Sequence, residues 1–209
     1  MTSRPVRNPD HLLTPENSLL AIIDYQPPQV NSIGSMDRQL LVNNIVGVAK
    51  IAKTYGAPII HSTVNVDTGL NQPPIIQLRN VIGDVPTIDR TSVNAWEDEE
   101  FVQAVEATGR KKLILTALWT EVCLAFPALD ALREGYEVYV VGDAVGGTSK
   151  EAHDFGLQRI QQAGGVIISW TQLLCEYQRD WARAETAHDM MRLFAEIGGN
   201  AGLQFVTEL

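Results

Sequence analysis

Cys123 lies where an apolar run meets a helix-like segment. The run Leu113–Leu118 predicts a strand buried on both faces, and apolar residues at helical spacing begin at Leu124. A thiol at a helix N-terminus feels the helix dipole and nearby backbone amides, which favour the nucleophilic thiolate. The same amides could receive a developing oxyanion. The alternative is that Cys123 packs as a small buried apolar residue.

Two charged residues could serve such a thiol. Asp24 closes the otherwise apolar run that starts at Ser18, and a carboxylate there could exchange a proton with the thiol. Arg90 follows a brief strand-like segment and could hold Asp24 ionised and lower the thiol pKa. The alternatives are a carboxylate that caps a loop amide and an arginine in a surface ion pair.

The elements that would position these residues alternate between strands and helices. Together they predict an α/β fold of three layers (αβα), with a doubly wound, mostly parallel sheet. The predicted strands lie within residues 18–26, 57–64, 85–90, 111–118, 136–143 and 165–170. The predicted helices span residues 38–55, about 98–108, about 124–133 and 150–164, with further helices towards the C-terminus.

Ligands of an open parallel sheet bind beyond the C-terminal ends of its strands. The polar residues at those predicted ends are Asp24, Gln26, His61, Asn65, Asp89, Arg90, Thr120, Cys123 and Asp143. His61 is interpreted as a hydrogen-bonded interior histidine, because the four histidines lack the spacing of metal ligands. Cys175 has apolar neighbours and is predicted to be core. The absence of a phosphate-binding loop argues against nucleotide binding, and the absence of a GxSxG elbow argues against Ser/His/Asp hydrolysis. No metal and no cofactor are predicted.

Composition limits the partners and the compartment. The net charge of -9 argues against nucleic acid and against an anionic membrane. Apolar runs are strand-sized, and the N-terminus lacks the apolar core of a signal peptide, so a cytoplasmic location is expected. Two cysteines make no disulfide framework, although their pairing stays open. We expect an N-terminal arm at residues 1–14 and a single domain at residues 15–209.

Three segments carry a resemblance to a known family. They are "LLAIIDYQ", "DRTSVNAW" and "LTALWTEVCLAFPALDALREGYEVYVVGDAVGG". They resemble the isochorismatase-like cysteine hydrolase superfamily, and "VNAWEDEEFVQAVEATGRKKLIL" with "CEYQRDW" is similar to its YcaC-like branch. The likeness covers roughly residues 18–182 and implies a flavodoxin-like sheet, the isochorismatase-like hydrolase fold.

The resemblance implies roles for particular residues. Asp24 matches the family aspartate, Cys123 matches the nucleophile, and Arg90 falls where most members carry lysine. It also implies a cis peptide bond between Leu118 and Trp119, with the Trp119 and Cys123 amides forming an oxyanion hole. The implied substrate-binding residues are Gln26, Asn65, Trp96, Trp119, Thr120 and Phe126.

The expected function is that of a metal-free cysteine amidohydrolase, which cleaves a small carboxamide-like substrate through a thioester. The segment "HSTVNVDTGLNQPP" does not reproduce the metal motif of nicotinamidases, and the cysteine favours amide over vinyl-ether hydrolysis. Two alternatives stay open: a low-turnover reactive-thiol or small-molecule-binding protein, suggested by arginine in place of lysine, and an isochorismatase-type vinyl-ether hydrolase.

The branch also implies a homo-oligomer, a tetramer or an octamer. The C-terminal helical segment, residues 171–209, is the expected contact region. The apolar area there and just before it comes from Trp170, Trp181, Phe194 and Phe205, for which packing within the chain is the alternative.

Overall fold

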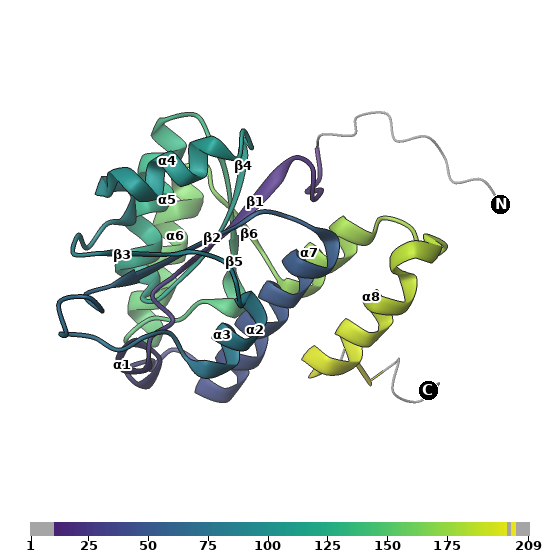
Figure 1. Ribbon diagram of the computed structural model, residues 1–209, viewed down its shortest axis with the longest axis horizontal. Coiled ribbons are helices and arrows are strands. Elements are labelled where there is room, and N and C mark those ends of the chain that lie inside the picture. The colour runs from purple at the N-terminus through teal and green to yellow at the C-terminus, as the bar shows by residue number, and fades with distance from the viewer. Residues whose placement is uncertain (1–10, 200–201, 204–209) are drawn as a thin grey trace.

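A six-stranded sheet forms the centre of the molecule, with helices on both faces (Figure 1). The computed structural model describes residues 11–199 and 202–203. The strand order is β3-β2-β1-β4-β5-β6, and every paired strand is parallel. The predicted three-layer, doubly wound fold is confirmed. The strands are β1 (Ser18–Ile23), β2 (Ile59–Val64), β3 (Thr87–Arg90), β4 (Lys112–Ala117), β5 (Glu137–Val141) and β6 (Val166–Ile168).

The predicted helices are present in the predicted order, and α1 (Pro27–Asn31) is an additional one that was not predicted from the sequence. The other helices are α2 (Arg38–Tyr55), α3 (Ile76–Ile82), α4 (Glu99–Ala107), α5 (Ala125–Arg133), α6 (Lys150–Gln162), α7 (Trp170–Gln178) and α8 (Ala184–Ile197). Helix α2 has the predicted bounds because both ends carry local signals. The Asp37 side chain accepts a hydrogen bond from the Leu40 amide, and Gly56 adopts φ 73°, which glycine tolerates without strain.

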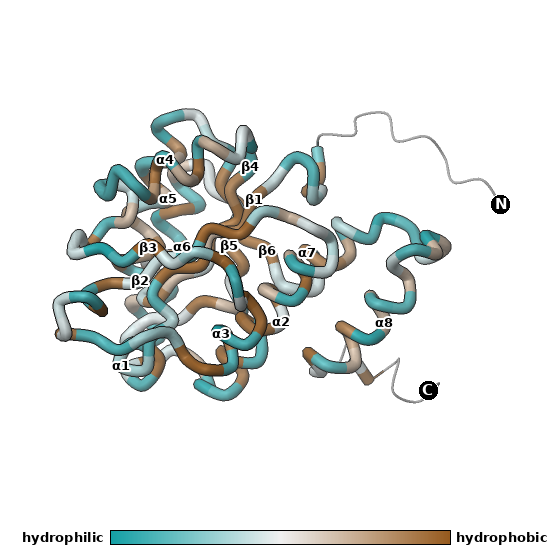
Figure 2. The backbone as a smooth tube through the Cα atoms, viewed as in Figure 1, coloured by the Kyte–Doolittle hydropathy of each residue, from teal (hydrophilic) through white to brown (hydrophobic). Residues whose placement is uncertain are grey.

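The sheet is buried on both faces, so its strands are apolar without alternation. Along β1, Leu20 and Ile22 belong to the core that α2, α3, α7 and α8 cover. Leu19, Ala21 and Ile23 belong to the other core, beneath α4, α5 and α6. Figure 2 shows the strands as the most hydrophobic part of the backbone.

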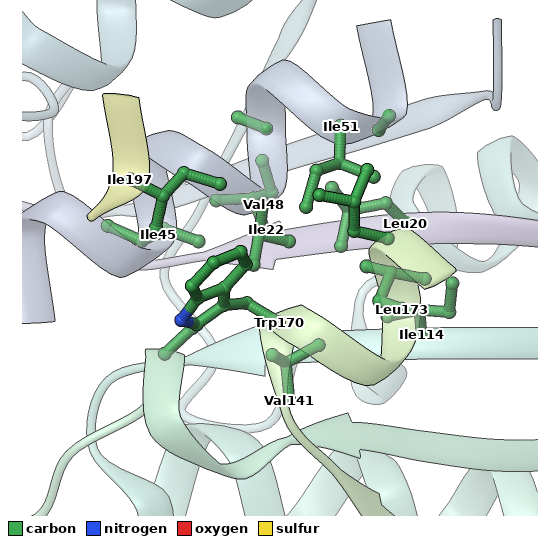
Figure 3. Packing of buried hydrophobic residues seen from close by; sticks show 14 of the residues in the cluster. Leu20, Ile22, Ile45, Val48, Ile51, Ile114, Val141, Trp170, Leu173 and Ile197 are labelled. Atoms are coloured by element: carbon green, nitrogen blue, oxygen red, sulfur yellow. The ribbon is translucent and has the colours of Figure 1, made fainter. Parts of the chain in front are cut away.

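Helix α8 packs against α2 inside the chain. Figure 3 shows Ile197, at the end of α8, close to Ile45 of α2, with Trp170 below them. Trp170 and Phe194 are buried, whereas Trp181 is 59% exposed and stacks on Phe194. Packing within the chain therefore accounts for part of the apolar area that the C-terminal sequence offers. The remaining aromatic residue, Phe205, lies outside the described residues.

Two further predictions, the N-terminal arm and the core position of Cys175, concern residues near α7. The predicted arm, residues 1–14, lies mostly outside the described residues, but Leu13 is fully buried and its amide donates to Glu176 at 2.6 Å. Cys175 is exposed, so its assignment to the core is wrong. Leu174 faces the core, and a helix turns about 100° per residue, which carries Cys175 away from it. No helix of the described residues is long and apolar enough to cross a membrane.

The contact between α2 and α8 gives a test of the packing. A Cβ atom on Gly47 would lie 2.6 Å from Cγ1 of Ile197. Glycine to alanine in a helix normally stabilises by about 0.5–1 kcal/mol. Here we expect Gly47→Ala to lower the free energy of unfolding by about 1–3 kcal/mol, measured by urea titration, because it overpacks the contact.

The control is the same change in an Ile197→Ala background, which lacks the contacted atoms. There Gly47→Ala should be neutral or stabilising. An equal loss in both backgrounds would show that the close approach of α8 is not the cause.

Candidate active site

Three strand ends bring the candidate catalytic residues together at one edge of the sheet. Asp24 directly follows β1 and has φ 63°, in the left-handed region that few residues other than glycine adopt. Arg90 is the last residue of β3, and Cys123 lies in the helical turn Thr120–Leu124 after β4. Because β1 is paired with both β2 and β4, Asp24 lies between the other two.

Asp24 and Arg90 form a buried, two-pronged ion pair. Nη1 of Arg90 donates to Oδ1 of Asp24 at 2.8 Å, and Nη2 donates to Oδ2 at 2.7 Å. Both side chains are fully buried. Charges in such a place need matched partners, because removal of one leaves the other unpaired at a cost of about 3–5 kcal/mol.

The neighbouring strand fixes the guanidinium further. Nη1 of Arg90 also donates to the Ser62 hydroxyl at 3.1 Å and to the Thr63 carbonyl at 3.0 Å. Burial lowers the pKa of Arg90, but the hydrogen bonds and charge of Asp24 raise it, and the net pKa lies above the usual value. Arg90 is therefore a fixed cation that does not exchange protons.

The Cys123 thiol differs from the sequence-based expectation. Burial, the charge of Asp24 and a hydrogen bond to Asp24 raise its pKa to about 12, although Arg90 and the Trp119 amide act in the opposite direction. The prediction of a lowered thiol pKa is therefore wrong. Burial and a facing carboxylate outweigh the helix terminus and the cation. The resting sulfur keeps its proton and shares it with Asp24.

The turn that carries Cys123 is fixed by its backbone. The Leu118–Trp119 peptide bond is cis, and the Trp119 amide donates to the Cys123 sulfur. The Thr120 amide donates to the Gly146 carbonyl at 2.9 Å, which ties the turn to the loop after β5. A Cβ atom on Gly156 of α6 would lie 3.0 Å from the Thr120 carbonyl, so α6 approaches this turn closely.

The predicted substrate-binding residues divide into two groups. Gln26 and Asn65 hold loops in place. The side-chain Nε2 of Gln26 donates to the carbonyls of Val64 and Gln72, and its Oε1 accepts from the Val64 backbone amide. The backbone amide of Asn65 donates to the Arg90 carbonyl at 2.9 Å. Both hydrogens of the Gln26 side-chain amide are used in this way. Gln26 is thus engaged by backbone groups rather than open to a ligand.

The other predicted residues lie on the cores or the turn. Trp96 is buried against Phe101 and Tyr136, with ring centroids 6.3 and 5.4 Å away. Phe126, like Cys123, is half-buried and packs on the same core. The Thr120 hydroxyl is fully buried and pairs with Nδ1 of His153 at 2.8 Å.

Trp119 is half-buried, and its side chain is held by the segment that follows α1. Its indole Nε1 donates to the Ser32 hydroxyl at 2.6 Å, which joins the turn to the chain after α1. Sequence reasoning named Trp119 but missed Ser32 and Ser62. A lone serine in an apolar strand or a short loop gives no signal of its own.

Glu121 was also missed. Its Oε1 accepts from the Thr148 amide at 3.0 Å and from the Thr148 hydroxyl at 2.7 Å, so it links the turn to the loop before α6. Within residues 11–199 and 202–203, no group of three or more His, Cys, Asp and Glu side chains could hold a metal ion.

The fold and the site together define a class of protein. It is a three-layer α/β protein in which a thiol, a carboxylate and a guanidinium meet beyond the C-terminal ends of parallel strands. Residues 18–172 match the family model described as the isochorismatase domain. The chain belongs to the isochorismatase family of hydrolases, as the resemblance predicted.

Similar proteins fall in the expected YcaC-like branch. The probable hydrolase YcaC of Escherichia coli (strain K12) is 36% identical over 170 residues, 81% of each chain. The structure of YcaC from Pseudomonas aeruginosa, with hexane-2,5-diol and covalent acrylamide, has a TM-score of 0.88 at 30% identity and covers 95% of this chain and 97% of its own. The Escherichia coli YcaC structure, described as an octameric hydrolase of unknown specificity, has a TM-score of 0.88 at 31% identity and covers 99% of this chain and 98% of its own.

The raised thiol pKa predicts an unusual response to Asp24→Asn. Asparagine keeps the shape and tolerates the left-handed backbone, but it removes the charge that opposes the thiolate. Arg90 then faces the sulfur without its counter-ion. We expect iodoacetamide to label Cys123 at pH 8 about tenfold faster or more, because one pKa unit changes the thiolate fraction tenfold.

The measurement uses a Cys175→Ala background, so that one thiol reacts, and thermal unfolding to verify the fold. In the protein with Asp24 intact, labelling should rise about tenfold per pH unit from pH 7 to 10 without a plateau. Equal or slower labelling of a folded Asp24→Asn variant would contradict the role of Asp24.

Proposed function

We propose that this protein is a metal-free cysteine amidohydrolase, acting on linear amide C–N bonds other than peptide bonds. Its substrate would be a small carboxamide-like compound, and its intermediate a thioester on Cys123. The observation that carries the proposal is the hydrogen bond between the Cys123 thiol and Asp24, whose carboxylate is clamped by Arg90. A protonated thiol beside a fixed carboxylate is the starting arrangement for general-base attack.

The first half of the reaction forms the thioester. As the sulfur of Cys123 attacks the carbonyl carbon, its proton passes to Asp24 and the carbonyl oxygen becomes an oxyanion. The amides of Trp119 and Cys123 would stabilise that oxyanion. Collapse of the tetrahedral intermediate breaks the C–N bond, and the leaving amine takes the proton from Asp24.

The second half releases the acid. Asp24, ionised again, accepts a proton from water as the water oxygen attacks the thioester carbonyl. The C–S bond breaks, the thiolate recovers a proton from Asp24, and the carboxylic acid leaves. Arg90 keeps the carboxylate in place and balances its charge throughout, because a guanidinium does not give up its proton at ordinary pH.

The relatives support two parts of this proposal. Acrylamide, covalent in the Pseudomonas aeruginosa structure, is both a small carboxamide and an electrophile that thiols attack. The octameric state of the Escherichia coli relative supports a homo-oligomer here, with residues 171–209 as the proposed contact region. Both cysteines are free rather than joined in a disulfide, which is in keeping with the proposed cytoplasmic location.

Intact-protein mass spectrometry with a panel of small primary amides tests the nucleophile. We expect a transient adduct with the mass of the substrate less one ammonia. The adduct and turnover should be lost in Cys123→Ala and kept in the matched control Cys175→Ala, since only Cys123 is paired with a carboxylate. Turnover that survives Cys123→Ala in a folded protein would overturn the mechanism.

A second candidate function follows from the same ion pair. Both carboxylate oxygens of Asp24 are engaged by Arg90, which makes them weaker proton acceptors. That observation favours a reactive-thiol or small-molecule-binding protein with little turnover on the same fold.

Arg90→Lys separates the two functions. Lysine keeps the charge but loses the two-pronged pair and the bonds to Ser62 and Thr63. If the protein is an amidohydrolase built around Arg90, we expect turnover to fall about tenfold, in line with the loss of a charge-assisted hydrogen bond. A gain in turnover, absent from the exposed control Arg159→Lys, would support the low-turnover function instead.

A further inference from the structure

His61 is a buried polar side chain that the proposed reaction does not use. It lies in the middle of β2, is fully buried, and its Nδ1 pairs with the Thr87 hydroxyl at 3.0 Å. Its Nε2 is also buried and has no hydrogen-bond partner in the described part of the chain. A buried, unpaired nitrogen costs about 1–3 kcal/mol, so a partner that satisfies it would bind with a gain of similar size.

A cavity of about 320 Å³ adjoins this imidazole. It lies between α3 and the edge strand β3, and His61 and Thr87 form its strand side. Ile76, Ile82 and Val85 provide apolar walls. Asn80, Thr87 and Arg79 add polar groups, so the cavity has a mixed lining, and its volume is in the range of a small-molecule site.

Charge in the cavity favours an anion. Arg79 of α3 lines it, is exposed, and forms no hydrogen bond or ion pair through its side chain with any residue that the structure describes. Burial lowers the pKa of His61 to about 4, so the imidazole is neutral near pH 7. None of the described lining residues of this cavity is acidic. The lining thus combines one exposed cation, Arg79, with one fully buried, neutral imidazole whose Nε2 is unpaired.

We propose that this cavity binds a small carboxylate whose apolar body ends in a hydroxyl group. The carboxylate pairs with Arg79, the body lies against Ile76, Ile82 and Val85, and the hydroxyl bonds to Nε2 of His61. A neutral imidazole offers one donor and one acceptor nitrogen, and the Thr87 hydroxyl can take either role at Nδ1. Nε2 can therefore donate to the hydroxyl or accept from it.

This site is separate from Cys123. Side chains alternate along a strand, so His61 and its neighbour Ser62 point to opposite faces of the sheet. Ser62 bonds to Arg90 in the candidate active site, whereas His61 faces α3. Binding at the cavity and hydrolysis at Cys123 can therefore fail independently.

The test is a titration of the full-length protein with 4-hydroxybenzoate, followed by the ring ¹⁵N resonances of labelled histidine. We expect a saturable shift of the His61 Nε2 resonance. His153 is the internal reference, because its Nδ1 bonds to Thr120 beside Cys123 and reports on the active site. It should stay unchanged over the same concentrations.

Two comparators define the ligand. The amide 4-hydroxybenzamide lacks the charge and should bind about tenfold more weakly, while benzoate lacks the hydroxyl and should shift Nε2 less at saturation. Arg79→Gln should weaken 4-hydroxybenzoate about tenfold. The matched control Arg133→Gln, which removes an exposed arginine on α5, should leave the affinity unchanged.

A further variant tests the cavity without touching its polar groups. Ile76 is 58% exposed, so Ile76→Trp should fold and fill the cavity, abolishing the His61 shift. The proposal fails if no His61 shift occurs up to about 10 mM ligand. It also fails if only His153 shifts, or if Arg133→Gln weakens binding as much as Arg79→Gln does.

Discussion

The buried ion pair between Asp24 and Arg90 is the interaction on which the candidate site depends. It joins the ends of two strands that are 66 residues apart in sequence, and both side chains are fully removed from water. Neither charge could stay there alone. The strand between them, β2, stabilises the pair, because its Ser62 hydroxyl and Thr63 carbonyl accept further hydrogen bonds from the guanidinium.

That pair also acts on the thiol. Burial raises the pKa of Cys123 most, and the carboxylate of Asp24 beside it raises the pKa further. The sulfur is therefore a protonated nucleophile that depends on its neighbour for activation, unlike a thiolate stabilised by a helix terminus. In this arrangement Arg90 acts on the sulfur in two ways: directly, by favouring the thiolate, and indirectly, by holding the Asp24 carboxylate in place.

Local sequence patterns determined much of the architecture. The strands are buried on both faces, so their continuous apolar runs were readable, and α2 carried its own capping signals at Asp37 and Gly56. The order of strands and helices then implied the parallel sheet, and Asp24, Arg90 and Cys123 stood out because each follows or ends a strand. The isochorismatase family model matches residues 18–172, which contain all six strands.

Tertiary structure alone decided the chemistry of the side chains. The raised pKa of Cys123, the loop-holding role of Gln26 and the core position of Trp96 depend on neighbours distant in sequence. Cys175 shows the same limit: apolar neighbours along the chain did not reveal which way its helix face turns. His61 was readable as an interior histidine, but the cavity beside it is formed by α3 and β3. The sequence determined which residues end each strand, because that is local, whereas burial and charge are set by whatever the fold brings alongside.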